Sequence, residues 1–332
     1  MSTIWKALKS ERPLLLDGAT GTELEKRGVD VSDRLWSGRA VMSDPEKLEE
    51  VYMDYLESGS DLIETATYQL SGKGLSALNI DPRETYQKSI EIAHKAQERY
   101  LKKTGKKTFI VGSIGPYGAY LADGSEYTGH YGEVDDQTLR AFHKDRLEYM
   151  YSSPLVDIIG FETIPTLDEV DVILDMMKEI AKTVHGEPKP FYIALSCNDE
   201  FALADGTSLH KALEHIDANL DDNLVAVGTN CCRLRTSMVL VEKFDLEFNN
   251  FPKLDKQCKI IIYPNSGEIF DVRIKSWKTD EALGITDLEE AFKIAAGKFL
   301  AKKRLGFVGG CCRTGPEHIK LLRKMIDEKA IE

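Results

Sequence analysis

The chain has 332 residues, 42% of them hydrophobic and 30% charged, and its formal net charge at pH 7 is −12. This acidity disfavours nucleic acid and anionic membranes as partners, and no apolar run approaches the roughly 20 residues that cross a bilayer. The N-terminal residues MSTIWKALKSERP lack the apolar centre of a signal peptide, so we expect a cytoplasmic protein.

Short apolar or β-branched runs recur along the chain at fairly even intervals. Their apolar residues are nearly continuous rather than alternating, which is typical of parallel strands buried on both faces. The eight runs lie at 14–20, 62–68, 109–115, 157–164, 191–197, 224–231, 259–265 and 305–311.

Helical patterns separate these runs. Ser43 stands three residues before Glu46, with Pro45 between them, and this spacing predicts a helix start with a capping box. Thr286 and Glu289 predict a second helix start of the same kind.

Eight strands, each followed by a helix, over roughly 300 residues are the make-up of a (β/α)8 TIM barrel. We therefore predict an α/β fold in which residues 1–332 form one barrel domain. A doubly wound open sheet is the alternative, because periodicity alone does not show closure. The longer interruptions at 21–43, 116–138 and 268–286 all follow strand ends, and in a barrel they form the catalytic face.

Two pairs of adjacent cysteines, Cys231–Cys232 and Cys311–Cys312, end the sixth and eighth runs. Only one strand separates these two strands, so both pairs can converge at the same end of a barrel. Four thiolates would close a structural zinc site, whereas three thiolates and an open position make a reactive one. Simple packing of small buried thiols is the other interpretation, and a redox pair is disfavoured because a vicinal disulfide is strained.

The residues around the second pair favour a metal site. Gly309 and Gly310 permit a sharp turn that aims two successive side chains at one ion. Arg313 and a helix beginning at Pro316 follow the cysteines, and we expect their positive character to offset the negative charge of a thiolate cluster.

Five motifs resemble those of the homocysteine S-methyltransferase family, in the family's order and over nearly the whole chain. They are DGATGTELEKRG at 17–28, FETIP at 161–165, GTNCC at 228–232, YPNSGE at 263–268 and GGCCRT at 309–314. The resemblance implies a barrel enzyme that binds one zinc ion per chain and methylates the thiol of homocysteine. It also implies three zinc ligands, with Cys232 left as a bystander: Cys231, Cys311 and Cys312.

The same resemblance implies how the amino-acid end of homocysteine is held. Asp17 and Glu162 would bind its ammonium group, the backbone amides of Gly18 and Ala19 would face its carboxylate, and Thr65 would lie nearby. A hydrolase or lyase that uses the two carboxylates as acid and base is a competing hypothesis, as is a non-catalytic barrel whose four thiols saturate the zinc.

The methyl donor must be a methylated cation, and aromatic faces bind such cations. The segment SEYTGHYG at 125–132 resembles a loop of the S-methylmethionine-using members, so we expect S-methylmethionine first and S-adenosylmethionine second. Betaine is a further alternative, although the chain lacks the C-terminal segment of the betaine-using members. The tyrosines predicted to contact the donor are Tyr68, Tyr117 and Tyr131.

The predicted partners are therefore small molecules, namely homocysteine and a cationic donor. A selenol acceptor such as selenocysteine or selenohomocysteine is a further possibility, because selenium would occupy the same position on zinc. The expected assembly is a monomer or a dimer.

Overall fold

Eight parallel strands form the centre of the structure, a computed structural model that describes residues 3–32, 34–184, 186–271 and 276–330. Each predicted run contains one of them, so all eight predicted strands are confirmed. They are β1 (Leu14–Leu15), β2 (Leu62–Glu64), β3 (Phe109–Ile114), β4 (Ile158–Ile164), β5 (Phe191–Leu195), β6 (Leu224–Asn230), β7 (Lys259–Tyr263) and β10 (Leu305–Val308).

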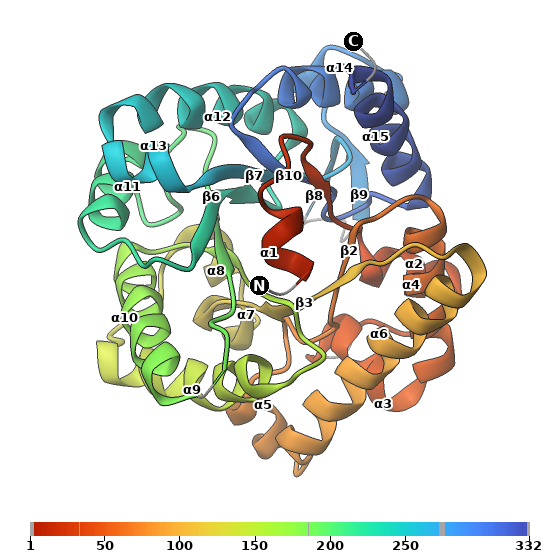
Figure 1. The fold of residues 1–332 in the computed structure, drawn as a ribbon, viewed down its shortest axis with the longest axis vertical. Coiled ribbons are helices and arrows are strands. Elements are labelled where there is room, and N and C mark those ends of the chain that lie inside the picture. The colour runs from red at the N-terminus through yellow and green to blue at the C-terminus, as the bar shows by residue number, and fades with distance from the viewer. Residues whose placement is uncertain (1–2, 33, 185, 272–275, 331–332) are drawn as a thin grey trace.

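The strands follow one another in the order β1-β10-β7-β6-β5-β4-β3-β2, and every neighbouring pair is parallel. The Asp61 amide donates to the carbonyl oxygen of Leu15 at 2.7 Å, which bridges β1 and β2 at the ends of this order. Seen along the barrel, helices surround the strands on all sides (Figure 1). The predicted (β/α)8 barrel is confirmed, and the open sheet is wrong.

The helices owe their position to apolar stripes. In α10 (Leu167–Thr183), for example, the buried residues include Val170, Ile173, Leu174 and Met177, which recur every three or four positions. The other helices are α2 (Thr20–Lys26), α3 (Ala40–Ser43), α4 (Pro45–Glu57), α5 (Gly72–Ala77), α6 (Pro82–Thr104), α7 (Tyr117–Leu121), α8 (Ser125–Thr128), α9 (Asp136–Ser152), α11 (Leu209–Ala218), α12 (Leu234–Glu247), α13 (Pro252–Gln257), α14 (Leu288–Leu300) and α15 (Pro316–Lys329), together with the short 3₁₀ helices at Trp36–Arg39, Phe248–Asn250 and Glu281–Leu283.

Both predicted helix caps are shifted by one residue. Ser43 belongs to α3, so Asp44 is the residue that precedes α4, and its side chain makes no capping hydrogen bond. Asp287, rather than Thr286, caps α14, because its carboxylate accepts from the amides of Glu289 and Glu290 at 3.0 and 3.2 Å. A carboxylate is also favoured over a hydroxyl at this end of the helix dipole.

The interruption at 268–286 contains more order than a loop. Two short antiparallel strands, β8 (Glu268–Asp271) and β9 (Ser276–Thr279), pair across it, and the residues between them lie outside the described part of the chain. The interruption therefore includes a β-hairpin that follows β7.

The N-terminal helix α1 (Thr3–Ala7) lies across one end of the barrel, at the centre of the ring in Figure 1. Its Ile4 side chain is buried in the cluster that holds the first residues of β2, β3 and β4. The Trp5 indole also donates to the Pro188 carbonyl, which precedes β5, at 3.2 Å. The helix therefore covers the N-terminal end of the strands and leaves their carboxyl ends to the loops. Among the described residues, no helix has the length and hydropathy that a membrane crossing requires.

Two glycines test the packing of the barrel with the same substitution. A Cβ on Gly228 of β6 would stand 1.8 Å from the Ile261 carbonyl oxygen of β7, so Gly228→Ala should lower the free energy of unfolding by at least about 3 kcal/mol. Gly297 lies on the exposed side of α14, where the nearest atom to an added Cβ is 4.0 Å away. Gly297→Ala should raise that free energy by about 0.5 to 1 kcal/mol. Chemical denaturation measures both, and a shift of the same sign in the two variants would contradict the role given to Gly228.

Candidate active site

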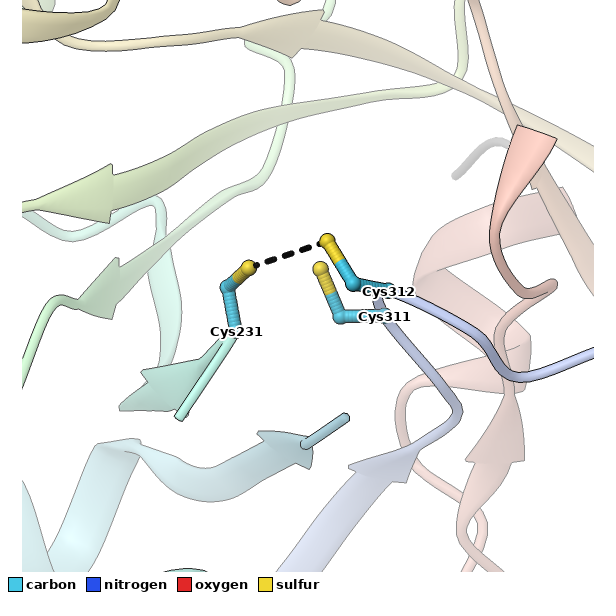
Figure 2. Close-up of side chains that lie close together, drawn as sticks. All are labelled: Cys231, Cys311 and Cys312. Atoms are coloured by element: carbon cyan, nitrogen blue, oxygen red, sulfur yellow. Dashed lines mark hydrogen bonds between the residues drawn. The ribbon is translucent and has the colours of Figure 1, made fainter. Parts of the chain in front are cut away.

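Three cysteines converge at the carboxyl ends of β6 and β10. Their sulfur atoms all lie within 4.8 Å of one another, and Cys231 Sγ is 3.5 Å from Cys312 Sγ. Figure 2 shows Cys231 reaching across from one strand end toward Cys311 and Cys312, which point back at it. Tetrahedral zinc with bonds of about 2.3 Å needs sulfur atoms about 3.8 Å apart, so these three thiols fit three corners of such a site.

The backbone aims these side chains in an unusual way. Cys231 has a φ of +49°, a left-handed conformation that costs energy for any residue with a Cβ. Two backbone hydrogen bonds hold the ligands in place, from the Cys231 amide to Tyr263 O at 3.1 Å and from the Cys311 amide to Pro264 O at 2.7 Å. Gly310, which was predicted to permit a sharp turn, does not have a positive φ. Glycine is required at this position because a Cβ would stand 2.1 Å from Thr314 Oγ1.

The three thiols of the cluster affect one another's pKa values. Hydrogen bonds from Cys311 and Cys312 hold the pKa of Cys231 well below its usual range. The same hydrogen bonds, with Cys231 as the charged member, raise the pKa values of Cys311 and Cys312. One thiolate is thus stabilised by two thiols, and a divalent cation would be needed to ionise all three.

Cys232 lies apart from this cluster. It is buried in the hydrophobic core, and burial raises its pKa, as it does for Cys258. Because buried apolar surroundings disfavour a thiolate, Cys232 is suited to packing rather than to binding a metal. A site in which all four thiols ligate zinc is therefore not supported.

Arg313 does not serve the cluster as the sequence had suggested. Its guanidinium forms an ion pair with the carboxylate of Glu268 at 3.0 Å. Because Glu268 neutralises the positive charge of Arg313, this charge does not offset the negative charge of the thiolates. Helix α15 does begin at Pro316, as predicted, so only the helix contribution remains.

Beside the cysteines, three carboxylates meet inside the barrel. Asp17 and Glu162 are 2% and 5% exposed, and Glu64, which was not among the predicted site residues, joins them. Tyr192 Oη donates to Glu64 at 2.6 Å, and Tyr263 Oη donates to Glu162 at 3.2 Å. The three groups form a buried acidic cluster that no lysine or arginine among the described residues is seen to neutralise.

Burial sets the protonation of this acidic cluster. It is the main reason that the pKa of Glu162 rises to about 7, although hydrogen bonds from Ser113, Glu64 and Tyr263 pull it back down. Burial and the neighbouring carboxylates also raise the pKa values of Asp17 and Glu64. Three carboxylates in such surroundings favour either protons or a cationic ligand.

The remaining residues predicted to bind substrate fall into two groups. The Ala19 amide donates to Thr314 O at 2.9 Å, so its predicted contact with a carboxylate is not supported here. The Gly18 amide has no acceptor among the described residues and stays available. Thr65 Oγ1 accepts from the Ser113 amide at 3.1 Å, and Ser113 Oγ in turn donates to Glu162. Thr65 therefore acts on the acidic cluster through Ser113.

Two residues that the sequence analysis did not select position the site. Asn230 joins the ends of β4 and β6, since its side chain accepts from the Thr163 amide at 2.8 Å and donates to Thr163 Oγ1 at 2.9 Å. Arg146, fully buried on α9, donates to the carbonyl oxygens of Thr67, Tyr68 and Gly115. It thereby fixes the segments that follow β2 and β3.

The three predicted donor tyrosines do not lie together. Burial is the main reason that the pKa of Tyr68 is raised, while a hydrogen bond with Thr163 lowers it and the charge of Cys231 raises it. Tyr68 therefore lies within electrostatic range of the cysteines. Tyr117 and Tyr131 stack edge to face, 5.4 Å apart, in a separate apolar cluster, and Tyr131 Oη donates to Glu169. A role for Tyr117 and Tyr131 in donor binding stays a prediction.

A family model described as homocysteine S-methyltransferase matches residues 14–326 of the chain. The chain belongs to this methyltransferase family. Homocysteine S-methyltransferase 1 of Arabidopsis thaliana is 35% identical over 323 residues, which cover 93% of this chain and 92% of that protein. Selenocysteine methyltransferase of Astragalus bisulcatus is 32% identical over a region that covers 95% of this chain and 93% of that protein.

Solved structures of this methyltransferase family share the barrel. The metallated form of the homocysteine methyltransferase MmuM from Escherichia coli superimposes with a TM-score of 0.77 at 30% identity, over 96% of this chain and 97% of that one. The resemblance drawn from the five motifs is thereby confirmed, and so is the prediction of a methyltransferase.

Proposed function

We propose that this methyltransferase makes methionine by moving a methyl group from S-methylmethionine to the thiol of homocysteine. The observation that carries the proposal is the meeting of three convergent thiols and a buried acidic cluster at the carboxyl ends of the strands. The first arrangement suits a metal-held thiol, and the second suits the ammonium group of an amino acid.

Cys231, Cys311 and Cys312 would hold the zinc ion. Zinc, when bound, would keep the acceptor sulfur as a thiolate at neutral pH, where a free thiol with a pKa of about 8.5 is mostly protonated. The metallated form of the Escherichia coli relative supports a metal in this family, and three thiolates in tetrahedral array favour zinc.

The protein's own part of the reaction is to orient two small molecules. Asp17 and Glu162 would bind the ammonium group of homocysteine, while the Gly18 amide would face its carboxylate. Tyr68 would cover the cationic methyl donor with its ring. The homocysteine sulfur, which would have lost its proton to solvent, then attacks the methyl carbon in line as a thiolate. The carbon–sulfur bond of the donor breaks, and the negative charge of the thiolate and the positive charge of the donor cancel. Because charge disappears in this step, alignment and a dry site supply the rate enhancement.

A competition among donors tests the proposal. The zinc-loaded, reduced protein is incubated with homocysteine and equal concentrations of S-methylmethionine, S-adenosylmethionine and betaine, each with a distinguishable methyl label. Methionine should carry the label of S-methylmethionine. A dominant label from another donor would refute the donor assignment, and no labelled methionine at all would refute the proposed reaction.

Selenocysteine is a second candidate acceptor, favoured by the similarity to the Astragalus bisulcatus enzyme. The same assay with selenocysteine in place of homocysteine decides between them, through the ratio of the two kcat/KM values. We expect the larger value for homocysteine.

The protonation of Glu162 makes homocysteine binding depend on pH. An ammonium group needs the ionised carboxylate, and the pKa of Glu162 is about 7, so KM for homocysteine should rise by about tenfold for each pH unit below 7. Glu64 donates a hydrogen bond to Glu162 that lowers the pKa of Glu162. Glu64→Ala removes this donor, so it should raise the pKa of Glu162 and move the rise in KM to higher pH. Initial rates between pH 5.5 and 8.5 measure the pH at which KM for homocysteine rises. If this pH is the same in the variant and the wild type, Glu64 does not affect the pKa of Glu162.

A further inference from the structure

Helix α8 (Ser125–Thr128) brings a second set of residues to the cysteines. Tyr127 Oη lies 3.3 Å from Cys231 Sγ. The helix is held in place from both sides, because the Ser125 amide donates to Asp123 at 3.0 Å and Ser125 Oγ donates to the His130 carbonyl oxygen at 3.0 Å. Gly118 of α7 also packs directly against the Glu126 amide, where a Cβ would come within 2.5 Å. The position of α8 beside the thiols is therefore built into the loop.

Glu126 of α8 has a carboxylate oxygen that lacks a partner. Its Oε2 atom is shielded from solvent and has no hydrogen-bond donor among the described residues. Burial is the main reason that the pKa of Glu126 rises to about 7, and the negative charges of Cys231 and Asp123 contribute to this rise. A shielded carboxylate between negative neighbours is costly unless a cation accompanies it.

Tyr68, in the segment that follows β2, lies within electrostatic range of Glu126. Burial is the main reason that the pKa of Tyr68 is raised, and the charges of Glu126 and Cys231 add to it. Because Tyr127, the next residue in α8, contacts Cys231 at 3.3 Å, Glu126 is also held close to an aromatic ring and the thiols. A negative group beside an aromatic face is the arrangement that binds methylated cations.

We propose that Glu126 binds the positive charge of the methyl donor and so selects a cationic amino acid as substrate. This inference rests on the proposed function, since it assigns a residue to the donor half of that reaction. An S-methylmethionine molecule carries two candidate charges, an ammonium group and a sulfonium group. The ammonium is the expected partner, because the sulfonium charge vanishes during transfer and a carboxylate beside it would stabilise the ground state more than the transition state.

Steady-state kinetics with Glu126→Gln test the assignment. The variant keeps the shape of the side chain and loses its charge, so KM for S-methylmethionine should rise at least tenfold, while kcat changes less than threefold and KM for homocysteine stays constant. Glu133→Gln is the matched control, since Glu133 is an exposed carboxylate on the same loop, and its kinetics should equal those of the wild type. Glu126→Asp retains the charge and should recover part of the donor affinity.

A second donor identifies which charge is bound. The deaminated analogue of S-methylmethionine keeps the sulfonium and lacks the ammonium. If Glu126→Gln raises KM only for S-methylmethionine, the carboxylate binds the ammonium; if KM rises for both donors, it binds the sulfonium. Unchanged KM values for both donors in a variant that methylates homocysteine would overturn the role of Glu126 and leave the proposed function intact. A wild-type protein that makes no methionine from any methylated cation would overturn both.

Discussion

Replacing Cys311 by serine should strip the protein of zinc and abolish methyl transfer. A neutral hydroxyl is a poor substitute for a thiolate, and the two remaining cysteines offer only two of the three tetrahedral positions that the cluster provides. Metal analysis should show zinc falling from about one ion per chain to below about 0.1, and activity should fall at least about 1,000-fold. The fold should persist in the circular dichroism spectrum, because the barrel core does not depend on this side chain.

Cys232→Ser provides the matched control, since it makes the same change one residue from a ligand. Cys232 sits in the hydrophobic core, so its replacement should lower the free energy of unfolding slightly and leave zinc content and activity near the wild-type values. If Cys232→Ser lost its zinc and Cys311→Ser kept it, Cys232 would be the ligand and Cys311 would not. That result would refute the proposed ligand set.

The barrel could be predicted from the sequence because its signals are local and repeated. Runs such as FIVGSI in β3 and KIIIY in β7 are apolar on both faces, and only strands covered by a surrounding layer have that composition. The closure of the barrel could not be predicted in the same way. It depends on contacts such as the one between Asp61 and Leu15, 46 positions apart, which no local pattern contains.

The ligand cysteines could be predicted for a related reason. Cysteine pairs are rare, and their places at the ends of β6 and β10 set them at the same end of the barrel. The polar residues that hold these cysteines in place could not be predicted from a sequence pattern of this kind. Arg146 lies in a helix with other charged residues, so the sequence gives no sign that it turns inward to bind three carbonyl groups.

The charges around the site show the same limit. Arg313 follows a cysteine pair and was expected to act on it, yet its partner Glu268 comes from a strand of the 268–286 hairpin that the sequence did not predict. Glu64 ends an apolar strand, and only the three-dimensional arrangement reveals that it meets Asp17 and Glu162. Pairing across strands decides whether a charged residue is free, neutralised or perturbed, and that pairing is a property of the fold.

The acidic cluster leads to the other large expected effect. Glu162→Gln should raise KM for homocysteine about 100-fold at pH 8, equivalent to about 2.7 kcal/mol of binding free energy, because the ammonium group loses a charged partner inside the barrel. Zinc content and KM for the donor should stay unchanged. Glu64→Gln is the matched comparison, since it makes the same substitution within the same cluster. Its effect at pH 8 should be small, because Glu64 influences Glu162 without meeting the substrate. Equal effects of the two substitutions at that pH would mean that the cluster binds the ammonium as a whole, and the assignment of Glu162 as its direct ligand would be wrong.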